Sequence, residues 1–208
     1  MASTSAQIQV SEPRVFTAGA IAITSAYGLV GLVPVFISFL MLSVLGFKFS
    51  ALLIGLAMIA IVIWLLPLAS GNPYVTKLVR SISPANSEDS NGFIVQITLS
   101  PRLRSDLRAL AEDADDIGYL TADDSRLFFQ GDSIKLSVPF AEITRVERKY
   151  RGLRSLFVPR IVVTVPGPLG SLEFGERAAA LLPASRRTSN RIYKLLLEKC
   201  AWNHQARN

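Results

Sequence analysis

The residues best suited to chemistry in this chain are basic side chains gathered between positions 145 and 160. Large apolar residues such as Tyr150, Leu156 and Phe157 lie among them, and Glu147 is the one acidic residue in the group. Cations mixed with apolar side chains bind anionic surfaces, and each cation near such a surface contributes about 1 kcal/mol. We therefore predict an anionic-surface binding segment, formed by Arg145, Arg148, Lys149, Arg151, Arg154 and Arg160.

Several alternatives remain open for this segment. The anionic surface is either a leaflet of anionic lipid head groups or an acidic protein partner. Nucleic acid is a rival ligand, because mixtures of basic and aromatic residues also bind phosphate backbones, but the membrane anchor inferred below argues against it. The structural alternative is a solvated strand and loop whose Leu and Phe side chains enter the core.

Metal binding and catalysis have less support in the sequence. A catalytic site needs a nucleophile with a base, or a paired acid and base, and the chain has one late histidine, His204, and one late cysteine, Cys200. A single cysteine also excludes an intrachain disulfide. Carboxylates can collect a hard cation, but the acidic residues between 112 and 124 do not follow an EF-hand spacing and are typical of charged turns. These acidic residues are Glu112, Asp113, Asp115, Asp116, Asp123 and Asp124. We predict no enzyme, no metal and no cofactor.

Two long uncharged runs precede these residues. One extends from Val15 to Phe47 and the other, after Lys48, from Phe49 to Thr76. A bilayer core about 30 Å thick needs roughly 20 apolar residues in a helix, and both runs are longer than that. They predict a hairpin of two transmembrane helices, at about 21–44 and 51–69.

The orientation of this hairpin follows from its flanking charges. The connection 46–50 is short, so the helices are antiparallel and both chain ends lie on one side of the membrane. Lys77 and Arg80 follow the second run, whereas Lys48 stands alone on the opposite side. The positive-inside rule then predicts an integral, multi-pass protein with both termini cytoplasmic, and the lack of eukaryotic sorting signals favours a bacterial inner membrane.

Small residues recur in these runs at helical spacing. Ala18, Ala22 and Ala26 lie four residues apart, and Ala51 and Gly55 repeat the spacing. Such stripes let transmembrane helices approach closely, so they form a candidate helix-packing face for a homo-oligomer or a larger membrane complex. The alternative is that small residues are simply common in membrane helices.

The remaining residues, about 130, suit one small domain. Residues 77–92 are predicted as a tether, rich in turn formers near its end. Residues 100–116 are expected to be helical between the first two strands. The helix 185–202 follows the last strand, with Thr188 or Ser189 as its cap. Period-two or β-branched patterns predict seven strands, at 93–99, 117–121, 126–130, 133–138, 142–148, 160–165 and 171–174.

Seven short strands followed by a C-terminal helix is the layout of the pleckstrin-homology superfold. The stretch from Asp116-Ile-Gly-Tyr-Leu-Thr through Arg126-Leu-Phe-Phe to Pro139-Phe-Ala-Glu-Ile-Thr-Arg-Val resembles the GRAM and bacterial PH-like domains. This resemblance implies a PH-like split barrel over residues 93–202. The basic turn by which many PH domains bind phosphoinositides is replaced by the segment 102–116 of mixed charge, so that ligand is not carried over.

The expected organisation combines a membrane α-hairpin with a small, mainly-β cytosolic domain. An N-terminal segment, residues 1–14, precedes the hairpin region 15–76, and after the tether and the domain 93–202 a short tail, 203–208, ends the chain. The residues after Thr76 hold 20 of the 22 basic and 15 of the 16 acidic residues, a net charge of +5. We expect a membrane-anchored binding or scaffold protein whose domain contacts the inner leaflet or a protein partner. The alternative is an accessory subunit of a membrane complex that acts through its transmembrane helices.

Overall fold

The described part of the chain is built around one antiparallel sheet. The computed structural model describes residues 5–13, 72–82, 92–103, 114–150 and 158–205, together with scattered residues between 17 and 57. The helices are α4 (Asn72–Ile82), the 3₁₀ turn η2 (Phe140–Glu142) and α6 (Leu182–Gln205). The strands are β1 (Gln7–Val10), β2 (Phe93–Ser100), β3 (Asp116–Ala122), β4 (Arg126–Gly131), β5 (Ile134–Pro139), β6 (Arg145–Lys149), β7 (Arg160–Thr164) and β8 (Ser171–Glu176).

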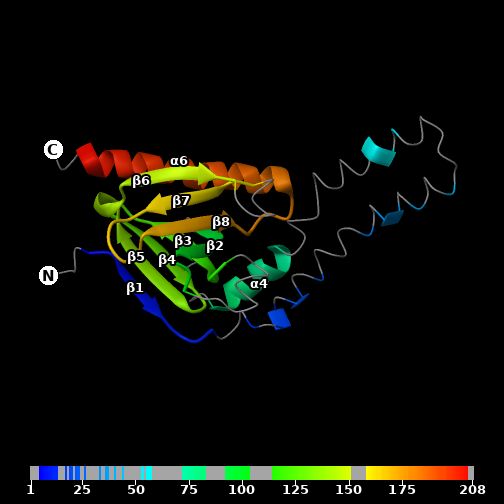
Figure 1. The fold of residues 1–208 in the computed structure, drawn as a ribbon, viewed down its shortest axis with the longest axis horizontal. Helices are drawn as coiled ribbons and strands as arrows, with labels where there is room; N and C mark the ends of the chain where they lie inside the picture. The colour runs from blue at the N-terminus through cyan, green and yellow to red at the C-terminus, as the bar shows by residue number, and fades with distance from the viewer. Residues whose placement is uncertain are drawn as a thin grey trace.

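The strands lie in the order β1-β5-β4-β3-β2-β8-β7-β6, and each neighbouring pair is antiparallel. β1 and β6 are therefore the two end strands of the sheet. In Figure 1, α6 runs beside β6, whereas α4 and β1 lie at the other side of the sheet in this view. Seven of the eight strands match predicted segments to within three residues, and β1 was not predicted.

The core forms because alternate residues of each strand point to the same face. In β5, Ile134 and Leu136 are buried while Lys135 between them is exposed. The rings of Phe129 and Phe174 pack in this core with centroids 6.4 Å apart. One face of α6 closes the core with Ile192, Leu196 and Cys200, which recur at helical spacing.

The start of α6 differs from the prediction. The helix begins at Leu182, three residues before the expected Ser185, with Pro183 in its first turn, where proline is tolerated. Ser189 is not a cap, because its buried hydroxyl donates to the carbonyl oxygen of Pro159 at 2.9 Å. This hydrogen bond fastens the middle of the helix to the segment before β7.

α4 packs on the sheet through Val75 and Val79, which contact Ile94 and Ile117. Its first residue, Asn72, is buried and donates from Nδ2 to the carbonyl oxygen of Ala179 at 2.7 Å. The sequence assigned residues up to 76 to the hairpin and 77–92 to a tether. In the structure 72–82 form one helix that belongs to the domain.

The prediction of a two-helix transmembrane hairpin is wrong by this structure. Among the described residues, no helix is long and apolar enough to cross a membrane. A span needs about 20 consecutive apolar helical residues. α4 has 11 residues, and α6 has 24 but carries six charged side chains between Arg186 and Lys199. Most of the predicted spans, 21–44 and 51–69, lies outside the described residues. The predictions of an integral, multi-pass, inner-membrane location and of cytoplasmic termini rested on these spans and are corrected with them.

Candidate functional site

The predicted basic segment begins on β6, an end strand of the sheet. Because side chains alternate along a strand, Arg145, Glu147 and Lys149 share one face. Arg145 Nη2 lies 2.9 Å from Glu147 Oε2, and Lys149 Nζ lies 2.8 Å from Glu147 Oε1. The hydrogen bond from Lys149, with the nearby charge of Arg145, holds the pKa of the Glu147 carboxyl below its usual range. Arg145 and Lys149 are exposed, Glu147 between them is half-buried, and the triplet carries one net positive charge.

Arg148 points the other way and joins β6 to α6. Its Nη1 donates to Asn190 Oδ1 at 2.9 Å, and its guanidinium carbon lies 4.6 Å from the centroid of the Tyr193 ring. Such a cation–π contact contributes about 0.5–1 kcal/mol at an exposed site. The two contacts place the basic strand directly beside the C-terminal helix.

Arg160 has a different role from the other cations of the predicted segment. Its side chain is buried, and its Nη1 lies 3.4 Å from Glu173 Oε2 and 3.2 Å from Thr98 Oγ1. It therefore holds β7 against β8 and β2 from inside the structure and does not share the exposed surface of β6. Arg151 and Arg154 lie outside the described residues.

The helix supplies cations that the sequence analysis did not select. Arg187 and Lys194 lie three residues before and four residues after Asn190, so they flank the place where Arg148 meets the helix. Both are exposed. We call the group formed by Arg145, Arg148, Lys149, Arg187 and Lys194 the basic face. The signal that could have found the helical pair is their seven-residue spacing on the polar side of the predicted helix.

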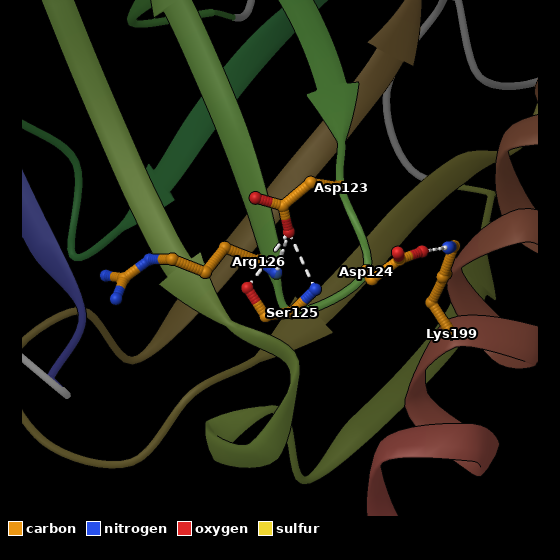
Figure 2. Close-up of polar contacts among 5 residues, drawn as sticks. All are labelled: Asp123, Asp124, Ser125, Arg126 and Lys199. Carbon is orange, nitrogen blue, oxygen red and sulfur yellow. Dashed lines mark hydrogen bonds and ion pairs between the residues drawn. The ribbon is translucent and has the colours of Figure 1, made fainter.

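The other end of α6 is fixed by an acidic turn, shown in Figure 2. Lys199 Nζ lies 2.6 Å from Asp124 Oδ1 in the turn between β3 and β4. In the same turn, Asp123 Oδ1 accepts hydrogen bonds from the backbone nitrogens of Ser125 and Arg126, each at 2.6 Å. Burial raises the pKa of Asp123, but these hydrogen bonds outweigh it and hold the pKa below its usual range.

Two further carboxylates of the predicted acidic group accept hydrogen bonds that hold the backbone in place. Asp115 Oδ2 accepts from the backbone nitrogen of Leu99 at 2.7 Å, and Asp116 Oδ2 accepts from the nitrogens of Ser133 and Ile134 at 2.8 and 2.7 Å. Within the described residues, no three metal-ligating side chains of His, Cys, Asp or Glu gather into a group that could hold an ion. Glu112 and Asp113 lie outside the described residues.

The predicted helix-packing face is only partly described. Ala22 and Ala26 are helical and exposed, and Gly55 is helical and buried. Ala18 and Ala51 lie outside the described residues. Most of the predicted helix 100–116 and the side chain of the late histidine, His204, also lie outside them. The helix-packing face therefore stays a prediction.

No protein-family model matches the chain, and no curated protein matches it.

Proposed function

We propose that the β-sheet domain with α6 is a binding domain that docks an acidic segment of a partner protein on the basic face. The observation that carries this proposal is the junction of β6 and α6, where Arg148 of the strand meets the helix between Arg187 and Lys194, while Arg145 and Lys149 lie on the other face of the same strand. Opposite charges on two proteins raise their association rate and select between partners. The function is therefore recognition and scaffolding rather than a reaction.

The position of β6 favours an extended polypeptide as the ligand. β6 ends the described sheet, and an end strand offers backbone N–H and C=O groups on its outer side. An added strand would pair with these groups while its acidic side chains met the cations. Tyr150, 67% exposed just after β6, and Leu197, 40% exposed on α6, offer apolar contacts beside the charges.

The sequence resemblance to PH and GRAM domains supports the proposal in a second way. It rests on the residues from Asp116 to Val146, which include the strands β3, β4 and β5. Domains of that group act in binding and scaffolding. This is an argument from fold resemblance, and the basic face supplies the local chemistry.

The experiment measures binding of the full chain to a fluorescent peptide of alternating glutamate and valine. The test variant replaces Arg187 and Lys194 with glutamine, and the matched control replaces Lys77 and Arg80, two exposed cations on α4, with glutamine. We expect the test variant to bind about tenfold more weakly, which is about 1.4 kcal/mol. We expect the control to change affinity by less than about twofold, and added salt to weaken the native complex.

Two outcomes would contradict the proposal. Equal losses in the test and control variants would mean that net charge, and not the basic face, determines binding. Binding to vesicles of anionic lipid that depends on Arg187 and Lys194, with no binding to the peptide, would assign the face to a lipid surface instead.

A further inference from the structure

A cavity of about 360 Å³ lies where β1, the β4–β5 turn and the end of α4 meet. None of its lining residues belongs to the basic face. Sites for small molecules have volumes of about 300–1,000 Å³, so this cavity suits a ligand at the small end of that range. Its walls are formed by Gln9, Val10, Ser11, Ile82, Gln130, Gly131, Asp132 and Lys135.

The turn that forms one wall is held in a single shape by a buried carboxylate. Asp116 Oδ2 accepts the backbone N–H groups of Ser133 and Ile134, and the N–H of Asp132 donates to the carbonyl oxygen of Ile117 at 3.3 Å. A Cβ atom on Gly131 would collide with the Asp116 carboxylate, so only glycine fits there. The cavity residues Asp132 and Lys135 are therefore presented by a pre-organised turn.

The opposite wall is fastened to the same turn. The backbone nitrogen of Ser11 donates to the carbonyl oxygen of Ser133 at 2.7 Å, and the Ser11 hydroxyl donates to the same oxygen at 3.3 Å. Gln9 pairs with Lys135 in the β1–β5 ladder. β1 and the residue after it, Ser11, thus supply three of the lining residues and keep their position relative to Asp132 and Lys135.

The lining combines groups that one kind of small molecule can satisfy together. Lys135 carries a positive charge, Asp132 a carboxylate, and the two glutamines offer both donors and acceptors. Val10 and Ile82 add apolar surface. A free amino acid has a carboxylate, an ammonium group and a short side chain. We propose that this cavity is a binding site for a free, polar α-amino acid, with Lys135 meeting the carboxylate and Asp132 the ammonium group.

Since β1 forms part of the site, binding of the amino acid and docking of β1 stabilise each other. Linkage requires this reciprocity whenever a ligand binds only the docked form. A bound amino acid should therefore protect the β1 amides from hydrogen exchange. This site is independent of the proposed docking of an acidic segment on the basic face.

The test is isothermal titration of the full chain with L-glutamine and the other standard free amino acids. We expect a polar amino acid to bind, and N-acetyl-glutamine methylamide, which lacks both backbone charges, not to bind. Lys135→Gln should weaken binding at least about tenfold, and so should Asp132→Asn. Lys77→Gln, which removes an exposed cation on α4 that does not line the cavity, is the matched control and should leave the affinity unchanged.

Lys135 is exposed, so its substitution tests the site even if Asp132→Asn disturbs the buried turn. The proposal is overturned if no free amino acid binds, if the blocked analogue binds as well as L-glutamine, or if Lys135→Gln binds like the native chain. Loss of peptide docking in the Arg187 and Lys194 variant would leave amino-acid binding intact, so the two proposals fail separately.

Discussion

A single buried carboxylate, Asp116, determines the shape of the β4–β5 turn. Burial raises the pKa of Asp116 above its usual range, although hydrogen bonds from Ser133 and Ile134 oppose the shift. Burial also raises the pKa of Glu176, which accepts from the backbone nitrogens of Ala178 and Ala179 and from the hydroxyl of Ser185. In both cases the folded chain holds the proton to a higher pH than the unfolded chain does.

The raised pKa of Asp116 leads to a prediction for Asp116→Asn. Since the folded protein binds more protons in the window between the unfolded and folded pKa values, the free energy of unfolding falls as the pH rises through that window. Asparagine keeps an acceptor oxygen but does not titrate. We expect Asp116→Asn to reduce this pH dependence and to stay within about 1 kcal/mol of the native chain at neutral pH, whereas Asp116→Ala loses about 1–3 kcal/mol.

Denaturant unfolding followed from acidic to neutral pH would measure both variants. Glu176→Gln is the companion variant, and it should remove a separate part of the same pH dependence. A native-like pH profile in Asp116→Asn would show that the carboxyl does not carry a raised pKa.

Cys200 gives a second prediction at the residue scale. Its side chain is buried against the core, and burial raises the pKa of the thiol to about 11. The thiolate is the reactive form, so the folded protein should be alkylated far more slowly at neutral pH than the denatured protein. Mass spectrometry after iodoacetamide treatment would measure this. Equal rates in the two states would mean that α6 does not cover the thiol.

At the scale of the element, α4 depends on a buried polar network at its first residue. Arg177 Nε donates to Asn72 Oδ1 at 3.0 Å, and Arg177 Nη1 donates to Gln96 Oε1 at 2.8 Å. Asn72 in turn donates to Ala179. The network connects the helix to β2 and to the segment after β8, so it fixes where α4 begins on the sheet.

We expect Asn72→Ala to destabilise the fold by about 1–3 kcal/mol, because it leaves buried partners unsatisfied. The amides of α4 should then exchange with solvent faster than those of β2–β8. Lys77→Gln, on the exposed side of the same helix, is the control and should change neither quantity. Unchanged exchange in Asn72→Ala would mean that Val75 and Val79 alone hold the helix.

The sequence predicted elements best where the pattern is local. Period-two alternation was enough for strands such as β4 and β5, because each residue's neighbours decide which face it takes. β1 was missed although Gln7, Ile8, Gln9 and Val10 alternate between polar and apolar residues, because a run of only four residues is a weak signal until its pairing with β5 is known. The start of α6 was missed because serine is a common helix cap, whereas the hydroxyl of Ser189 donates a hydrogen bond to the carbonyl oxygen of Pro159.

At the scale of the whole molecule, the candidate site was predicted in part. The sequence selected Arg145, Arg148 and Lys149, which lie together on β6. The sequence could not show that Arg160 is buried, because its burial depends on strands β2 and β8. It also could not show that Arg187 and Lys194 lie beside β6, because their position depends on how α6 packs. The uncharged runs are evident in the composition, but most of their residues lie outside the described part of the chain, and none of the described helices has the length and apolar composition of a span.

The pairing of β1 has a consequence for how the chain is made. Gln7 faces Ser137, 130 positions later in the sequence. Ribosomes add about 5–20 residues per second, so this segment leaves the exit tunnel roughly 7 to 26 seconds before its neighbour does. During that interval Ile8 and Val10 cannot pair with β5. Slowing translation should therefore lengthen their exposure to chaperones and proteases, and a bulky fusion ahead of Ser5 should impair maturation more than one placed after the C-terminus.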